Sequence, residues 1–96
     1  MNKNQIVEFL KSHKEDMLRK YGVKKIGLFG SYARNEATEN SDIDIVVEMD
    51  AHHIFRNFFA LGQYLKDHLR KNVDLGTESS VKPIAAERIM KEVIYV

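Results

Sequence analysis

The apolar pattern between residues 23 and 71 constrains the fold more than any other feature of this sequence. Two short runs rich in β-branched residues, Val23 to Phe29 and Asp42 to Glu48, predict strands. The segment from His53 to Lys71 repeats its apolar residues every three or four positions, which predicts a helix with one buried face. These apolar residues are Ile54, Phe58, Leu61, Leu65 and Leu69. Strands and helices that alternate along a short chain favour a sheet covered by helices.

The chain before the first strand also carries a helical pattern. Apolar residues at helical spacing predict a helix over residues 2–21, with Gly22 as its C-terminal cap. His13 lies on the same stripe, and we interpret it as a packing residue rather than a ligand or catalytic base. Residues 31–40 are small and polar and predict a turn or helical hook, in which Ser31 caps a short helix through Ala33.

The C-terminal third completes a mixed α/β pattern. Residues 72–76 predict a third short strand, and Pro83 predicts the start of a final helix with one apolar face. The last residues are open to extension as a strand. The apolar face of this last helix comprises Ala86, Ile89, Met90 and Val93. The sequence therefore predicts a single domain over residues 1–96, with a small mixed three-stranded sheet packed with helices.

Composition narrows the functional classes. Hydrophobic residues make up 44% and charged residues 30%, which favours a compact fold over a disordered chain. The net charge of +1 is too small for bulk attraction to nucleic acid or anionic lipid. Without cysteine there is no disulfide framework or thiolate nucleophile, and no secretory signal or membrane span is visible. We expect a cytoplasmic protein with no membrane association and no direct nucleic-acid binding.

Asp42 and Asp44 form the first candidate site. Side chains alternate along a strand, so both carboxylates are expected on one face, roughly 6.6 Å apart. At an effective dielectric of about 20 their repulsion is roughly 2.5 kcal/mol. A divalent cation with a preference for oxygen ligands, Mg²⁺ or Mn²⁺, would offset it. The alternative is that both aspartates simply face solvent at a sheet edge.

Gly30 and Ser31 form the second candidate site. They follow the first strand directly, where a turn into a short helix presents backbone N–H groups and a hydroxyl to phosphate oxygens. A Gly-Ser pair on its own is common in ordinary turns. Its value here depends on the aspartates that follow it.

Together, Gly30-Ser31, ten intervening residues and Asp42-Ile43-Asp44 form the pattern G-S-x10-D-x-D. This pattern resembles the nucleotidyltransferase superfamily of polymerase-β type, and the stretch from residue 28 to residue 47 resembles its minimal nucleotidyltransferase (MNT) group. The resemblance implies Mg²⁺-dependent transfer of a nucleoside monophosphate from an NTP, with ATP favoured, to an acceptor hydroxyl. It assigns the metal-binding pair to Asp42 and Asp44 and the phosphate-binding turn to Gly30 and Ser31.

Two further residues are assigned by the same resemblance. Asp74 matches the third carboxylate of the family, as a shared metal ligand or a general base, although an aspartate after a helix is also an ordinary turn residue. Arg34 either reaches the triphosphate or pairs with Glu36 or Glu39 on the surface. Asn35 stands where many relatives carry glycine, and asparagine tolerates the same left-handed turn.

The resemblance also implies a partner. The MNT group is similar to one component of toxin–antitoxin pairs whose other member is a helical HEPN protein. The resemblance of this chain to that group therefore implies a hetero-oligomer with an HEPN toxin. The expected activity is attachment of AMP to a tyrosine of that toxin, and the alternative is a catalytically silent antitoxin that acts by binding. Phe55 and Phe59 form a second apolar stripe on the helix over residues 53–71, interpreted either as buried on both sides or as a contact with another chain.

Overall fold

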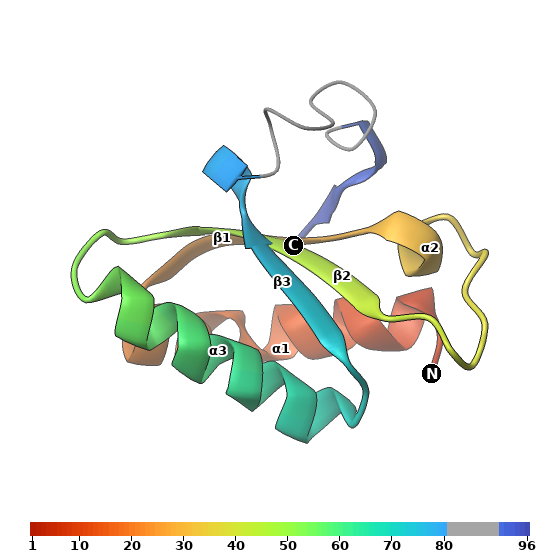
Figure 1. Cartoon of the computed structure of the whole chain (residues 1–96), viewed down its shortest axis with the longest axis horizontal. Helices are drawn as coiled ribbons and strands as arrows, with labels where there is room; N and C mark the ends of the chain where they lie inside the picture. The colour runs from red at the N-terminus through yellow and green to blue at the C-terminus, as the bar shows by residue number, and fades with distance from the viewer. Residues whose placement is uncertain (81–90) are drawn as a thin grey trace.

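In the computed structural model, which describes residues 1–80 and 91–96, helices cover one face of a mixed sheet. The elements are α1 (Lys3–Tyr21), β1 (Val23–Phe29), α2 (Gly30–Ala33), β2 (Ile43–Met49), α3 (Ile54–Leu69), β3 (Val73–Thr77) and β4 (Ile94–Tyr95). Figure 1 shows α1 and α3 lying together beneath the sheet, with α2 at the end of β1. The α/β class and the expected helix and strand order up to β3 are confirmed.

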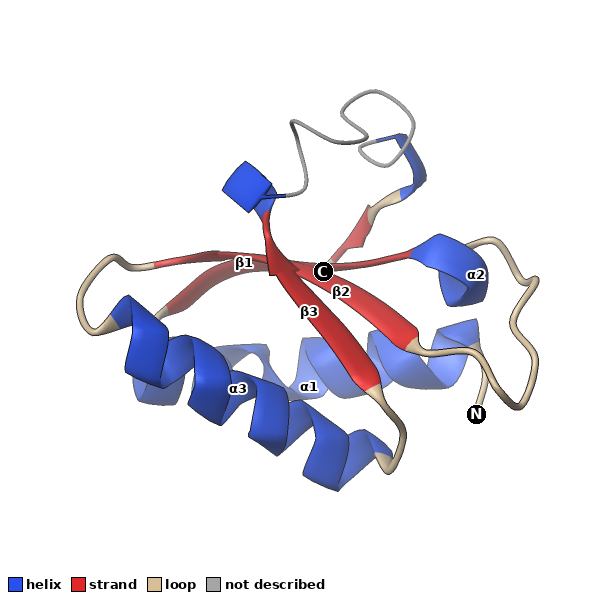
Figure 2. Ribbon diagram, in the orientation of Figure 1, coloured by secondary structure: helices blue, strands red, loops and turns tan. Residues whose placement is uncertain are grey.

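The sheet has four strands rather than the three we expected. Its order is β3-β2-β1-β4, as the strands of Figure 2 show. β1 pairs with β2 and with β4 in antiparallel fashion, whereas β2 and β3 run parallel. The extra strand is short: Tyr95 pairs with Gly27, and Ile94 pairs with Leu28. The final helix predicted from Pro83 falls largely outside the described residues.

The core lies between the sheet and the two long helices. The apolar stripe of α1 is buried, and so is the C-terminal half of the stripe of α3, as their spacing predicted. Strands β1 and β2 direct alternate side chains onto these helices. The fully buried members of this core are Ile6, Leu10, Met17, Ile26, Leu28, Ile43, Ile45, Val47, Leu61 and Leu65.

The ends of α1 follow the sequence rules for helix caps. Asn2 and Gln5 form a capping box with two reciprocal hydrogen bonds of 2.9 Å. At the other end Gly22 adopts a left-handed φ of 70° and closes the helix. His13 is half-buried and stacks on Phe9 with a centroid separation of 4.1 Å, which fits the packing role predicted for it.

The prediction for Ser31 was wrong in one respect. The short helix α2 begins at Gly30, and Phe29 occupies its N-cap position without a side-chain hydrogen bond. Ser31 therefore lies inside the first turn rather than capping it. The glycine, with a φ of 75°, already turns the chain out of the strand, so no side-chain cap is required.

Candidate active site

The contact between Gly30 and Asp44 is the tightest feature of the candidate site. The antiparallel register places Asp44 opposite Phe29, the last residue of β1, so its side chain lies beside the turn at Gly30. A Cβ atom at Gly30 would lie 2.1 Å from Asp44 Oδ2 and 2.9 Å from its Cγ. Only glycine therefore allows the carboxylate to rest against the backbone of the turn.

Asp74 lies beside Asp44 on the neighbouring strand. In the parallel pairing of β2 and β3 the two aspartates are direct partners. Paired residues project from the same face, and neighbouring strands are about 4.8 Å apart. Asp42 comes one residue before β2 and is exposed. The strand pairing thus brings Asp44 and Asp74 together and places Asp42 at the same edge.

The pKa of Asp44 is raised because the carboxylate is partly buried and lies near two other carboxylates. The pKa is raised from 3.8 to about 6, mainly by burial and then by the carboxylates of Asp74 and Asp42, while Arg34 lowers it. The Asp44 carboxylate accepts no hydrogen bond from any residue of the described part of the chain. The site therefore brings together carboxylates, and no donor among residues 1–80 and 91–96 offsets the charge of Asp44 by a hydrogen bond.

Arg34 lies just after α2 and is held by two carboxylates. It forms ion pairs of 3.0 Å with Glu36 and with Glu92, and hydrogen bonds to these two groups raise its pKa. The predicted pairing with Glu36 is confirmed, whereas no ion pair with Glu39 is present. Sequence reasoning missed Glu92, because no local pattern links residues 58 positions apart.

The remaining predicted residues lie around the same turn. Ser31, in the first turn of α2, is half-buried. Asn35 has a φ of 60°, so the left-handed conformation expected of it is confirmed. Gly30, Ser31 and Arg34 are thus carried by one short segment that faces the start of β2.

A hard divalent cation fits the donor set of this site. The neighbouring carboxylates of Asp44 and Asp74 offer oxygen ligands, and the raised pKa of Asp44 reflects charge that a cation would neutralise. Among residues 1–80 and 91–96, no group of three or more histidine, cysteine, aspartate or glutamate side chains is arranged to hold a metal by itself. A metal here would therefore draw ligands from water and from substrate phosphates, as Mg²⁺ commonly does.

The fold and this site define the class of nucleotidyltransferases. The family model described as "Nucleotidyltransferase domain" matches residues 10–96, and the chain belongs to this family. The protein adenylyltransferase MntA of Thermococcus cleftensis is 40% identical over 92 residues, which cover 96% of this chain and 93% of MntA. A candidate protein adenylyltransferase of Methanocaldococcus jannaschii, MJ0128, is 45% identical over 94 residues, covering 97% and 96% of the two chains.

Solved structures point to the minimal members of the family. A candidate minimal nucleotidyltransferase aligns with a TM-score of 0.75 at 28% identity, covering 98% of this chain and 95% of that one. A toxin–antitoxin structure with AMP-PNP aligns with a TM-score of 0.65 at 27% identity, covering 99% and 72%. A Shewanella oneidensis complex of a tri-AMPylated HEPN toxin with an MNT antitoxin aligns with a TM-score of 0.56 at 26% identity, covering 98% and 67%.

These matches confirm the resemblance found in the sequence. The chain is an enzyme of the nucleotidyltransferase class, similar to MntA proteins and to the MNT components of toxin–antitoxin pairs. Within the described residues, none of the helices is both long enough and apolar enough to span a membrane.

Proposed function

We propose that this protein is a Mg²⁺-dependent adenylyltransferase that moves AMP from ATP to a tyrosine hydroxyl of an HEPN-type toxin and so acts as its antitoxin. The observation that carries the proposal is the Asp44 carboxylate, held against the Gly30 backbone and paired with Asp74. The MntA relative supports the reaction, and the solved toxin–antitoxin complexes support the partner.

The transfer is a substitution at the α-phosphorus of ATP. The acceptor oxygen forms a bond to that phosphorus, the bond to the oxygen that bridges to the β-phosphate breaks, and pyrophosphate leaves with the electron pair. The hydroxyl proton must pass to a base. Asp74 is exposed beside Asp44, where it serves either as that base or as a further metal ligand.

Asp42 and Asp44 are the proposed metal ligands. When bound, Mg²⁺ would supply positive charge against the phosphate oxygens and the developing charge of the leaving group. The protein side contributes a fixed carboxylate: the glycine contact and the strand pairing leave Asp44 little freedom to move away. A carboxylate fixed in this way would hold the cation in a preorganised position against the phosphate oxygens.

Gly30, Ser31 and Arg34 are the proposed phosphate-binding residues. The first turn of α2 offers backbone N–H groups and the Ser31 hydroxyl next to the metal-binding carboxylates. Arg34 has acidic partners in Glu36 and Glu92, so a triphosphate would compete with two carboxylates for its guanidinium group.

A binding-only antitoxin is the alternative, and one surface feature supports the partner contact that it shares with the enzyme. Phe55 and Phe59 are 81% and 78% exposed, so the interpretation that this stripe is buried on both sides is wrong for the isolated chain. Large exposed aromatic side chains one helical turn apart are typical of protein contacts. We assign these two residues to the interface with the HEPN-type partner, which both functions require.

Labelling separates the two functions. Each NTP carrying label at the α-phosphate is incubated with Mg²⁺, the protein and an extract of its native host, and labelled proteins are identified by mass. We expect label from ATP on one helical protein. The matched variants are Asp44→Asn, which should abolish labelling, and Asp50→Asn, which changes the same residue type beyond the other end of β2 and should not.

Each result has a defined meaning. Label that persists in Asp44→Asn would contradict the proposed site. Absence of label, although a helical protein co-purifies with the chain, would establish the binding-only function. Peptide mapping of the labelled band then tests tyrosine as the acceptor, and label on another residue type would refute that part.

A further inference from the structure

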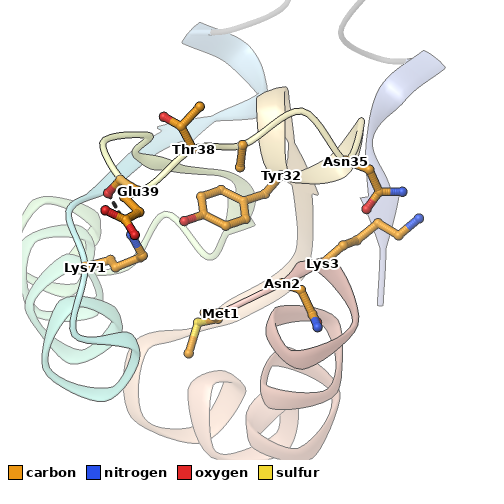
Figure 3. Close-up of a pocket in the computed structure, with 9 residues that line it drawn as sticks. Met1, Asn2, Lys3, Tyr32, Asn35, Thr38, Glu39 and Lys71 are labelled. Atoms are coloured by element: carbon orange, nitrogen blue, oxygen red, sulfur yellow. Dashed lines mark hydrogen bonds between the residues drawn. The ribbon is translucent and has the colours of Figure 1, made fainter.

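A cavity lies beneath the hook, residues 31–40, and none of the proposed catalytic carboxylates lines it. It measures about 600 Å³, a size typical of small-molecule sites, and we call it the hook cavity. Three segments line it: the start of α1, the hook and Lys71 after α3, as Figure 3 shows. None of the residues assigned to metal or triphosphate binding is among its lining residues.

Tyr32 forms the interior wall of the hook cavity. Its side chain points into the cavity in Figure 3, and the residue is only 4% exposed. Its hydroxyl makes no hydrogen bond to any described residue. Because no fully buried side-chain polar atom of the described chain lacks a partner, this hydroxyl reaches the cavity surface. A hydroxyl on an otherwise buried ring is thus directed at whatever occupies the cavity.

The charge around the cavity favours an anion. The Lys71 ammonium lies 5.9 Å from the centroid of the Tyr32 ring, and Lys3 lies at the opposite wall. The first turn of α1 contains no acidic residue, so the positive end of its dipole is not neutralised by its own side chains. Asn2 uses its side-chain oxygen to cap Gln5, which leaves its amide NH₂ as a donor.

Acidic groups are fewer than basic groups at this cavity. Among the residues that the structure describes, Glu39 is the single acidic one that lines the cavity, and its backbone carbonyl accepts a hydrogen bond of 3.2 Å from Lys71 Nζ. A neighbouring hollow of about 570 Å³ shares Glu39 and Lys71 and adds Lys66 and Arg70, together with Asp42. The basic side chains therefore continue from one hollow into the next.

We propose that the hook cavity is a binding site for a small phosphate-bearing molecule, distinct from the nucleotide site. The ionised oxygens of a phosphate group accept hydrogen bonds and have no proton to donate. They would accept hydrogen bonds from the Tyr32 hydroxyl and the Lys71 ammonium. The occupant would contact Asn35 and Thr38, which lie in the segment that joins Ser31 to Asp42. The site goes beyond the proposed transfer reaction, and its existence does not depend on that reaction.

The test is an NMR titration of the full chain with inorganic phosphate and with pyrophosphate, without Mg²⁺. We expect saturable shifts of the Asn35 and Thr38 amide signals. Tyr32→Phe removes a single oxygen that makes no hydrogen bond within the described chain, so it keeps the fold while weakening binding about tenfold. Lys71→Gln should weaken binding as well.

Four outcomes would overturn the proposal. One is the absence of saturable shifts in the wild type with either phosphate compound. Another is binding that Tyr32→Phe leaves at full strength, which would place the anion elsewhere. The third is acetate binding as tightly as phosphate, which would assign the cavity to carboxylates. The fourth is a set of shifts that is largest at the Gly30 and Ser31 amide signals, which would trace the binding to the nucleotide site.

Discussion

Two contacts between a glycine and an aspartate lie at opposite ends of the β1–β2 pair. They differ in whether the aspartate is hydrogen-bonded within the fold. Gly22 precedes β1 with a φ of 70°, and a Cβ atom there would meet Asp50 Cβ at 3.1 Å. Gly30 follows β1 with a φ of 75°, and its Cβ would meet Asp44 Oδ2 at 2.1 Å. Residue type and backbone conformation are therefore nearly the same at the two ends.

Hydrogen bonding separates the two ends. At the first, Gly22 N–H caps α1, Gly22 carbonyl accepts the Asp50 N–H at 2.8 Å, and Asp50 Oδ1 accepts the His52 N–H at 3.0 Å. At the second, the Asp44 carboxylate has no donor within the described residues and faces Asp74. The first contact completes the fold, whereas the second leaves a fixed charge for a ligand to neutralise.

The largest expected effect comes from exchanging the two aspartates for asparagine. Asp44→Asn should lower AMP transfer by roughly 10³-fold or more, because it removes a proposed ligand of the cation that would neutralise the reacting phosphate. Asp50→Asn should keep transfer within about twofold, since asparagine still accepts the turn hydrogen bond. Initial rates of label transfer measure both. Equal losses in the two variants would show that Asp44, like Asp50, serves only the fold.

The two glycines offer the next comparison. Alanine at either position must adopt a left-handed conformation, which costs about 1–2 kcal/mol of folding stability. Gly30→Ala also displaces the Asp44 carboxylate, so transfer should fall by about 10²-fold, whereas Gly22→Ala should reduce stability alone. Urea unfolding and label transfer, measured on both variants, separate the effects. Full activity in Gly30→Ala would refute the importance of the contact.

The Asp50 end also leads into the exposed part of α3. The turn after β2 ends at His53, and Phe55 and Phe59 follow in the first turns of the helix. Replacing both with serine should weaken association with the HEPN-type partner by about 10- to 100-fold, the range for aromatic residues central to an interface. Sedimentation of the mixed proteins measures it. Thermal unfolding checks that the variant is folded, and undiminished association would place the interface elsewhere.

The local parts of this comparison could be predicted from the sequence. Alternating and helical spacing located β1, β2 and α3 to within two residues, and Gly22 marked the end of α1. The G-S-x10-D-x-D pattern picked out Gly30, Ser31, Asp42 and Asp44 as candidate site residues. These features depend on neighbouring residues, so the sequence records them directly.

The nonlocal parts could not be predicted. The Gly30–Asp44 contact depends on the β1–β2 register, and the Asp44–Asp74 pair depends on the parallel order of β2 and β3. The Arg34–Glu92 ion pair and the fourth strand join segments far apart in the chain. Tyr32 lies in the segment predicted as a polar hook, and only the folded hook shows that its side chain points into a cavity.

The smallest expected effect is a pH dependence of stability that comes from Asp44. Its pKa is about 6 in the folded chain against an ordinary value of 3.8, so the folded state holds this proton more tightly than the unfolded state. Stability must then fall as pH rises from about 4 to about 6, and the loss is complete above that window. Because solvent screens a partly exposed carboxylate, we expect a loss on the order of 1 kcal/mol.

Urea unfolding of three proteins between pH 4 and pH 7 isolates this contribution. Asp44→Asn carries no charge at any of these pH values, so its stability should decline less than that of the wild type. Asp50→Asn should retain the wild-type decline, because it leaves the Asp44 end unchanged. If Asp44→Asn declined as steeply as the wild type, the charge at the Gly30 end would not be destabilising. The two ends of β1 would then be electrostatically alike, and the reason to expect a cation at one of them would be lost.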